Sequence, residues 1–302
     1  MLIDSHAHVN FNAFKDDGDE VIKKCLDNDV WVVNVGAEYR TSRRAVEYAN
    51  RYQEGVYAIV GLHPIHIKVE SEKSKNEKDG QEINNEDIKY REEFDYQKYL
   101  DLARDEKVVA IGEVGLDYHH FESLTNYESI QIYELEIGKI IKKQKETFIE
   151  FIRLANEINK PLVIHCWGVK SKEEFDHVRA DAYADLLEIL KEYPVNKNGI
   201  VHSFIGSYKT AREFRELGFK LSFNGIITYS ESYDKVLTDT PIEDILVETD
   251  CPYLTPSPLV KSERNEPINV RYVVEKIARV KGMEAEEVIR IVEKNTKEVF
   301  GI

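Results

Sequence analysis

The 302-residue chain has a mass of 35.1 kDa, a net charge of −15 and a pI near 5.2. Its hydrophobic fraction of 42% is enough for a substantial core, and its apolar runs are far shorter than the roughly 20 residues of a membrane span. The acidic balance argues against a wide nucleic-acid-binding surface, because basic residues supply most non-specific affinity for phosphates. Three cysteines without close spacing, and no apparent secretory signal, predict a reducing cytoplasmic location.

Short β-rich runs alternate with amphipathic segments along the chain. The predicted strands are Met1–Ser5, Val30–Gly36, Val56–Leu62, Val108–Glu113, Pro161–Cys166, Gly199–Phe204, Phe219–Asn224 and Ile245–Asp250. The predicted helical segments include Thr41–Tyr52, Glu146–Asn159, Tyr208–Leu217 and Arg271–Val280. Several strands are nearly continuous in Val, Ile and Leu, which is typical of parallel strands covered on both faces. The pattern predicts an α/β protein with a (β/α)8 TIM barrel. An open doubly wound sheet is the alternative, but no G-x-G-x-x-G motif follows a strand.

Three connections after predicted strands are unusually long. They span about residues 67–96, 116–145 and 167–182, and the second has helical character between Tyr127 and Lys143. The first is polar and highly charged, which indicates a mobile excursion. Because loops that follow barrel strands lie on the catalytic face, these insertions are expected to shape access to the site. Without an internal repeat or linker, residues 1–302 are predicted to form a single domain.

Side chains of the types that bind metals occur at the ends of five predicted strands. They are His6 and His8 in DSHAH, Glu113 in IGEVGLD, His165 in LVIHC, His202 in GIVHSF and Asp250 in ILVETD. Any one of them alone is readily explained as a hydrogen-bonded or helix-capping residue. A barrel, however, brings the carboxyl ends of all its strands to one rim. The joint pattern therefore predicts a metal site at the mouth of the barrel.

Four imidazoles and two carboxylates are too many ligands for one tetrahedral ion. We therefore predict two divalent ions, with Zn, Mn or Mg as candidates. The predicted ligands are His6, His8 and Asp250 for one ion and His165 and His202 for the other, with Glu113 bridging the two. Two ions roughly 3.5–4 Å apart lower the pKa of a shared water and stabilise charge on phosphorus. Asp250 is predicted to accept the proton of that water as a general base.

Seven short motifs are distributed along the chain. They are DSHAH (4–8), GLHP (61–64), IGEVGLD (111–117), PLVIH (161–165), HSFIGS (202–207), ETDCPYL (248–254) and RNEP (264–267). In this order and spacing, the chain resembles the TatD family of metal-dependent deoxyribonucleases, a branch of the amidohydrolase-like barrels. The resemblance covers nearly the whole length and matches the six ligands one for one. It implies an ester-bond hydrolase that trims single-stranded DNA from the 3′ end.

Four further residues on the predicted rim are candidates for substrate contact or for positioning. His63 is expected to hydrogen-bond a phosphate oxygen or leaving group in a catalytic and substrate-binding role; its alternative role is to cap the following turn. Asp117 either accepts a hydrogen bond from a ligand histidine or caps the next segment. Lys261 and Arg264 are candidate phosphate contacts, with surface ion pairs to neighbouring glutamates as the alternative.

Three features depart from the family pattern. Cys166 and Trp167 follow His165 where the family often has a basic residue, the last loop reads KSERNEP in place of RGxRNEP, and the long insertions have no counterpart. Trp167 and Tyr253 either stack on an unpaired base or anchor loops by packing. None of these departures touches a predicted metal ligand, so they leave metal-dependent hydrolysis as the prediction and open the question of the substrate.

Three functions of different classes are compatible with the sequence. The first is a DNA phosphodiesterase, and the second is a metal-dependent esterase or amidase, including hydrolysis of an aminoacyl-tRNA ester. The third is an inactive barrel that serves as a scaffold, against which the intact ligand set argues. Nothing indicates a membrane or protein partner, and a monomer is expected.

Overall fold

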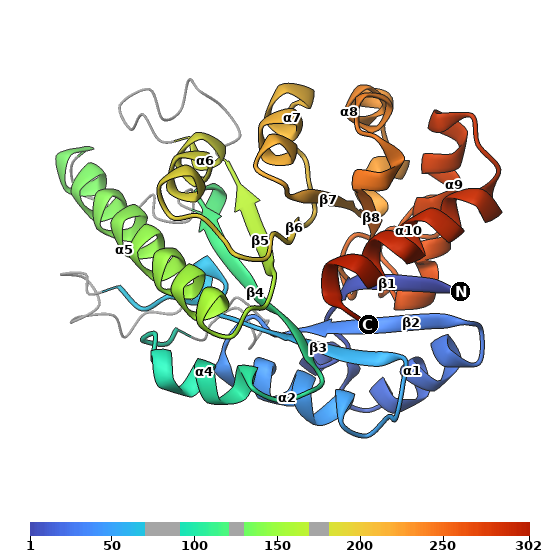
Figure 1. Cartoon of the computed structure of the whole chain (residues 1–302), viewed down its shortest axis with the longest axis horizontal. Helices are drawn as coiled ribbons and strands as arrows, with labels where there is room; N and C mark the ends of the chain where they lie inside the picture. Colours follow the sequence, from blue (N-terminus) through green and yellow to red (C-terminus); the bar gives the residue numbers. More distant parts are fainter. Residues whose placement is uncertain (70–90, 121–129, 169–180) are drawn as a thin grey trace.

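The computed structural model describes residues 1–69, 91–120, 130–168 and 181–302, with the backbone alone for residues 130–134 (Figure 1). These residues contain eight strands: β1 (Leu2–Ala7), β2 (Val30–Val35), β3 (Val56–Val60), β4 (Val108–Asp117), β5 (Leu162–Trp167), β6 (Ile200–Val201), β7 (Lys220–Phe223) and β8 (Ile245–Val247). The helices are α1 (Gly18–Leu26), α2 (Tyr39–Ala49), α4 (Tyr96–Ala103), α5 (Ile130–Glu157), α6 (Ala182–Glu192), α7 (Tyr208–Glu216), α8 (Asp234–Asp239), α9 (Val270–Lys281) and α10 (Ala285–Phe300). Short 3-10 helices are η1 (Asn12–Phe14), η2 (Pro64–His66), η5 (Gly225–Thr228), η6 (Glu231–Tyr233), η7 (Ile242–Asp244) and η8 (Pro267–Asn269).

The strands form one parallel sheet in the order in which they occur along the chain, from β1 to β8. At the seam between β8 and β1, the backbone amide of Asp250 donates to the carbonyl of His6 at 2.9 Å. On the same seam, the amide of His8 donates to the carbonyl of Cys251 at 2.9 Å. Helices surround the sheet (Figure 1). The fold is therefore the predicted (β/α)8 barrel, and all eight predicted strands are present.

Neighbouring residues of a strand pack into two different apolar clusters, because side chains alternate between the faces of a sheet. Leu2 and Val32 belong to the larger cluster, which includes the buried faces of the helices. Ile3 and Val33 belong to a smaller cluster with residues of β3, β4, β5, β6 and β8, inside the barrel. This packed interior supports the strand ends, so the side chains that follow them are held on a rigid frame.

The structure corrects several boundaries expected from the sequence. Strand β4 does not end at Glu113 but continues to Asp117, β6 is only two residues long, and β8 ends at Val247 and not at Asp250. Residues 130–145, predicted as part of an insertion, form the first half of the 28-residue helix α5. The predicted excursions at 67–96 and 167–182 lie largely outside the described residues. Within the described part of the chain, no helix is both long and apolar enough to cross a membrane.

Candidate metal centre

The six predicted ligands meet at one end of the barrel. His6 lies in β1 and His8 directly follows it; Glu113 lies within β4, and His165 lies near the end of β5. His202 directly follows β6, and Asp250 comes three residues after β8. Glu113 is followed closely by Gly115, whose φ is +142°. A Cβ added at residue 115 would lie 2.0 Å from the carbonyl oxygen of His165. A side chain there would therefore separate β4 from β5 and move Glu113 away from His165.

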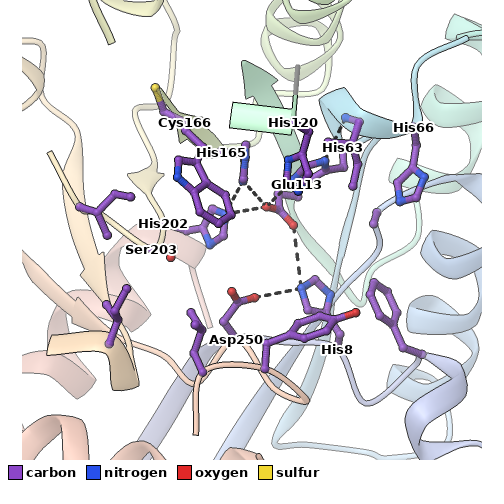
Figure 2. Close-up of a pocket in the computed structure, with 18 residues that line it drawn as sticks. His8, His63, His66, Glu113, His120, His165, Cys166, His202, Ser203 and Asp250 are labelled. Carbon is purple, nitrogen blue, oxygen red and sulfur yellow. Dashed lines mark hydrogen bonds and ion pairs between the residues drawn. The ribbon is translucent and has the colours of Figure 1, made fainter. Parts of the chain in front are cut away.

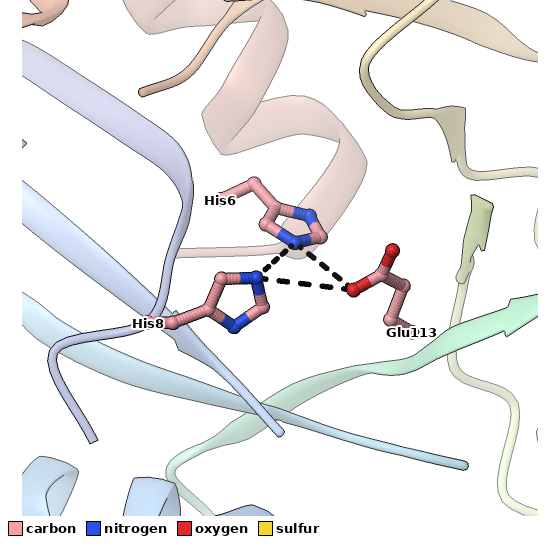
Figure 3. Close-up of side chains that lie close together, drawn as sticks. All are labelled: His6, His8 and Glu113. Carbon is pink, nitrogen blue, oxygen red and sulfur yellow. Dashed lines mark hydrogen bonds and ion pairs between the residues drawn. The ribbon is translucent and has the colours of Figure 1, made fainter. Parts of the chain in front are cut away.

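Glu113 lies between two groups of histidines, and each of its oxygens faces a different group. Its Oε1 is 2.8 Å from Nδ1 of His165 and 2.6 Å from Nε2 of His202 (Figure 2). Its Oε2 is 3.5 Å from Nε2 of His6 and 3.9 Å from Nε2 of His8 (Figure 3). A carboxylate in this position has one oxygen available for each of two cations.

The group around Oε2 is completed by Asp250. Nε2 of His8 lies 3.2 Å from Oδ1 of Asp250, and Nε2 of His6 lies 3.8 Å from the same oxygen. The two Nε2 atoms are 3.2 Å apart. Nδ1 of His8 donates to the carbonyl of Val35 at 2.8 Å, so in the neutral ring the lone pair is on Nε2.

This arrangement fits bound cations. A lone pair on Nε2 of His8 that faces the carboxylates of Asp250 and Glu113 is repelled by them unless a proton or a metal ion lies between. Among the described residues, three overlapping sets of buried or nearly buried side chains have potential ligand atoms within 4.8 Å of one another. They are His6, His8 and Glu113; His6, His202 and Asp250; and His63, Glu113 and His165. Imidazole with carboxylate is a donor set for zinc and manganese.

The carboxylates and imidazoles shift each other's pKa values in opposite directions. Burial alone would raise the pKa of Glu113, but the adjacent His202, His63 and His165 hold it well below its usual range. Burial lowers the pKa of His165, but hydrogen bonds with Asp117 and Glu113 outweigh burial and raise it to about 9. Burial would also raise the pKa of Asp250, yet the contact with His8 keeps it at about 2. The carboxylates are therefore ionised at neutral pH, as metal ligands must be.

A cavity of about 370 Å³ opens onto this cluster (Figure 2). The predicted ligands His8, Glu113, His165, His202 and Asp250 line it, as does His63. Its other described walls are mainly apolar or aromatic, and they comprise Phe11, Ala37, Ile65, His66, His120, Cys166, Trp167, Ser203, Ile205, Ile226, Tyr253 and Leu254. The cavity gives a substrate a direct approach to Glu113 and Asp250.

The comparisons with known proteins agree with this geometry. The family model described as TatD related DNase matches residues 3–301. The chain belongs to this family.

It is 36% identical to the uncharacterized metal-dependent hydrolase YabD of Bacillus subtilis over 100% of both chains. It is 30% identical to the uncharacterized metal-dependent hydrolase MJ1582 of Methanocaldococcus jannaschii, over 99% of this chain and 96% of that one. The crystal structure of YjjV, a TatD homologue from Escherichia coli, superposes with a TM-score of 0.73 at 24% identity, over 100% of this chain and 98% of that one. The protein is thus a metal-dependent hydrolase of the TatD family.

In this TatD-family site, Asp117 contacts two imidazoles. Its Oδ2 accepts from Nε2 of His165 at 3.1 Å and from Nδ1 of His120 at 2.8 Å, and its Oδ1 accepts from the backbone amide of His120. Both roles considered for Asp117, orienting a ligand histidine and capping the next segment, are compatible with these contacts. Because Nε2 of His165 points to Asp117, Nδ1 is the atom that faces Glu113.

Two residues of the site, Glu248 and His120, are not identified by sequence reasoning. Glu248 is fully buried, and its Oε1 lies 3.5 Å from Nδ1 of His202 while accepting from the amide of Ser203 at 2.7 Å. The only sequence signal for it is its place in the ETD motif, two residues before Asp250. His120 follows the LDYH segment, and its side chain is 49% exposed and lines the cavity.

The predicted substrate contacts differ in position. His63 lines the cavity, with Nε2 3.4 Å from Oε1 of Glu113, and its Nδ1 also accepts from the amide of Ile65 as the cap of η2. Arg264 forms a bidentate ion pair with Asp17 at 2.9 and 2.6 Å. Lys261 is exposed, with Nζ 5.3 Å from the centre of the Tyr229 ring. The described lining of the cavity includes neither Lys261 nor Arg264.

Proposed function

We propose that this TatD-family hydrolase is a two-metal phosphodiesterase that trims single-stranded DNA, with 3′-to-5′ polarity. The observation that carries the proposal is the position of Glu113, whose two oxygens face separate groups of histidines. A pair of ions on either side of a shared carboxylate is suited to in-line displacement at phosphorus. The proposal also agrees with the description of the family as DNases.

The six ligands have separate tasks in this proposal. His6, His8 and Asp250 would hold one ion, His165 and His202 the other, and Glu113 both. When bound, two divalent ions would lower the pKa of an attacking water and stabilise the charge that develops on phosphorus. The chain itself would contribute the fixed orientation of these ligands, because five of the six side chains are buried within a packed barrel.

Proton transfer is proposed for two side chains that line the cavity. Asp250, with a pKa of about 2, is ionised at neutral pH and would accept a proton from the attacking water. Burial, and after it the neighbouring His165, lower the pKa of His63 to about 3, so His63 is neutral. Since Nδ1 of His63 accepts from Ile65, its proton is on Nε2, from which it would donate a hydrogen bond to the leaving oxygen.

Contacts with the remaining phosphates are proposed for Lys261 and Arg264. Arg264 already donates to the carboxylate of Asp17, so a phosphate would have to replace Asp17 as its partner. Lys261 lies in the same loop after β8 and is exposed. Asp117 would act through His165, by holding its ring in the orientation that directs Nδ1 toward the metal centre.

The test is to remove metal from the purified protein with a chelator and to restore Mg, Mn or Zn separately. Each form is assayed on end-labelled single-stranded DNA beside Glu113→Ala. We expect metal-dependent shortening from the 3′ end that is lost in the variant, because both ions lose a ligand. If DNA survives with every metal while about two ions per chain are bound, the phosphodiesterase proposal is wrong and the metal centre stands.

One observation favours a second candidate, an ester or amide hydrolase. The described lining of the cavity has no lysine or arginine, and much of it is apolar. A neutral acyl substrate would enter such a cavity without the desolvation of a phosphate. Strong esterase or amidase activity beside weak phosphodiesterase activity, measured on the same metal-loaded sample, would favour this candidate.

A further inference from the structure

Trp167 lies beside the metal centre on the wall of the cavity. It is the last residue of β5, two positions after His165, and pairs with Asp117 of β4 in the register of the sheet. Its carbonyl accepts from the amide of Tyr118 at 2.8 Å. The indole is half-buried and lines the same cavity as Glu113 and Asp250, so part of its surface is accessible from the cavity.

Two histidines hold the plane of this indole. His119 stacks on Trp167 with ring centres 4.2 Å apart and an interplanar angle of 7°. His120 meets the indole edge-on, at 5.5 Å and 88°. His120 is itself bonded to Asp117, which also accepts from the ligand His165. The aromatic surface is therefore fixed relative to the metal centre, and a ring that stacks on it would lose little additional side-chain freedom.

Within the cavity, aromatic stacking is the main available source of nucleotide affinity outside the metal centre. Among the described lining residues there is no lysine or arginine. Besides the histidines, the described wall includes Ile205, Ile226, Leu254 and the 40%-exposed Tyr253. The cavity of about 370 Å³ is at the lower end of the roughly 300–1,000 Å³ that is typical of small-ligand sites. It is suited to one unpaired unit of a strand, not to a duplex.

We propose that Trp167, supported by His119, is a stacking subsite for the unpaired nucleobase next to the scissile bond. The proposal rests on the phosphodiesterase function and specifies its substrate as a strand end whose terminal base is free to stack. Recognition through the face of a base is tolerant of sequence, because every base has an aromatic face. In this proposal, an aromatic contact from Trp167 takes the place of the basic side chain that the TatD family often has after the residue at the position of His165.

The first experiment compares two substrates in the metal-loaded enzyme. One is a single-stranded oligonucleotide with a terminal thymine, and the other carries a tetrahydrofuran abasic unit in its place. For the thymine substrate we expect Trp167→Ala to lower kcat/KM by about 5- to 150-fold, the range of one base–aromatic stack. The abasic substrate should lose less than threefold, and Trp167→Phe should retain most of the preference for the base. Equal losses on both substrates would overturn the proposal, because they indicate a structural role.

The second experiment measures binding without turnover. The chain contains two tryptophans, Trp31 and Trp167, so Trp31→Phe leaves Trp167 as the only indole. In chelated protein, thymidine monophosphate should quench this fluorescence saturably, and deoxyribose phosphate should not. The absence of quenching by the nucleotide would overturn the stacking subsite whether or not DNA is cleaved. Cleavage of neither oligonucleotide, together with quenching, would instead refute the phosphodiesterase function and leave the aromatic subsite standing.

Discussion

The carboxylate of Glu248 lies on the side of the His202 ring opposite to Glu113. Oε1 of Glu248 is 3.5 Å from Nδ1 of His202, whereas Oε1 of Glu113 is 2.6 Å from Nε2 of the same ring. Glu248 is fully buried and is held by the amide of Ser203. A histidine that binds a metal through one nitrogen commonly donates from the other to a carboxylate, which fixes the ring and raises its basicity. We therefore predict that Glu248 orients His202 through Nδ1.

This relationship predicts the effect of Glu248→Gln on metal binding. The amide removes the negative charge behind His202, so we expect the affinity for one of the two ions to fall about 10- to 100-fold. Isothermal titration with Mn or Zn would resolve the two sites. The control is Glu213→Gln on the exposed face of α7, which should leave both affinities unchanged. If Glu248→Gln binds each of the two ions as tightly as the unmodified protein does, the role assigned to Glu248 is wrong.

Asn265 leads to a prediction about the stability of the loop that carries Asp250. This fully buried side chain donates from Nδ2 to the carbonyls of Thr249 at 3.1 Å and Tyr253 at 2.8 Å. Asn265→Ala leaves both carbonyls without this donor, at a cost of roughly 1–3 kcal/mol for each buried group left unsatisfied. For the two carbonyls together, we expect the free energy of unfolding in urea to fall by at least about 2 kcal/mol. The asparagine of the RNEP motif thus supports the site from outside it.

The control for this prediction is Asn50→Ala, at an exposed asparagine that donates to Asp105 at 3.0 Å. Its effect should stay within about 0.5 kcal/mol, as is usual for surface substitutions. If Asn265→Ala lowers the free energy of unfolding by no more than Asn50→Ala does, the side-chain amide of Asn265 does not stabilise the loop.

The positions of the predicted ligands follow from the sequence because parallel strands in a barrel end at one rim. His165 and Asp250 are far apart in the chain, yet each follows an apolar run that has to be a buried strand. No such local rule identifies Glu248, since it follows β8 whereas its partner His202 follows β6. The same reason explains β4, which continues past Glu113 because Gly115 allows the backbone to approach β5 closely. Features that depend on contacts between different strands cannot be predicted from local sequence patterns.

Helix α5 shows a different limit of sequence reading. Its first half is predicted as part of an insertion, because the sequence divides into one helical stretch from Tyr127 to Lys143 and a separate one from Glu146 to Asn159. Periodicity identifies the helical character, but the continuity of one 28-residue helix depends on packing against the barrel. The long acidic segment before α4 lies largely outside the described residues, so its expected mobility stays a prediction.

The two ring nitrogens of His63 have different roles, so a substitution should separate its capping of the turn from its proposed role in catalysis. Its Nδ1 accepts from the amide of Ile65, and its Nε2 faces Glu113 at 3.4 Å. Asparagine retains a short acceptor for the turn but has no group at the position of Nε2. For His63→Asn we expect a melting temperature close to that of the unmodified protein and a fall in kcat of about 10²-fold, the lower end for the loss of one hydrogen-bond donor to the developing charge. Metal stoichiometry distinguishes the alternatives, because loss of one ion would make His63 a ligand.

The pKa of His165 predicts how metal binding depends on pH. Burial lowers this pKa, but hydrogen bonds with Asp117 and Glu113 raise it to about 9, so the imidazole of the metal-free protein is protonated at pH 7. An ion that binds its Nδ1 has to displace that proton. Below a pH of about 9, the apparent affinity for the metal ion should therefore rise about tenfold per pH unit for each proton released. Above that pH, the contribution of His165 should level off.

Calorimetry in buffers of different ionisation enthalpy counts the protons that metal binding releases. Asp117→Asn removes one carboxylate that raises the pKa, so it should shift the plateau to lower pH. Binding enthalpies that are independent of the buffer from about pH 6 to 9 would show that the ions do not displace a proton from His165.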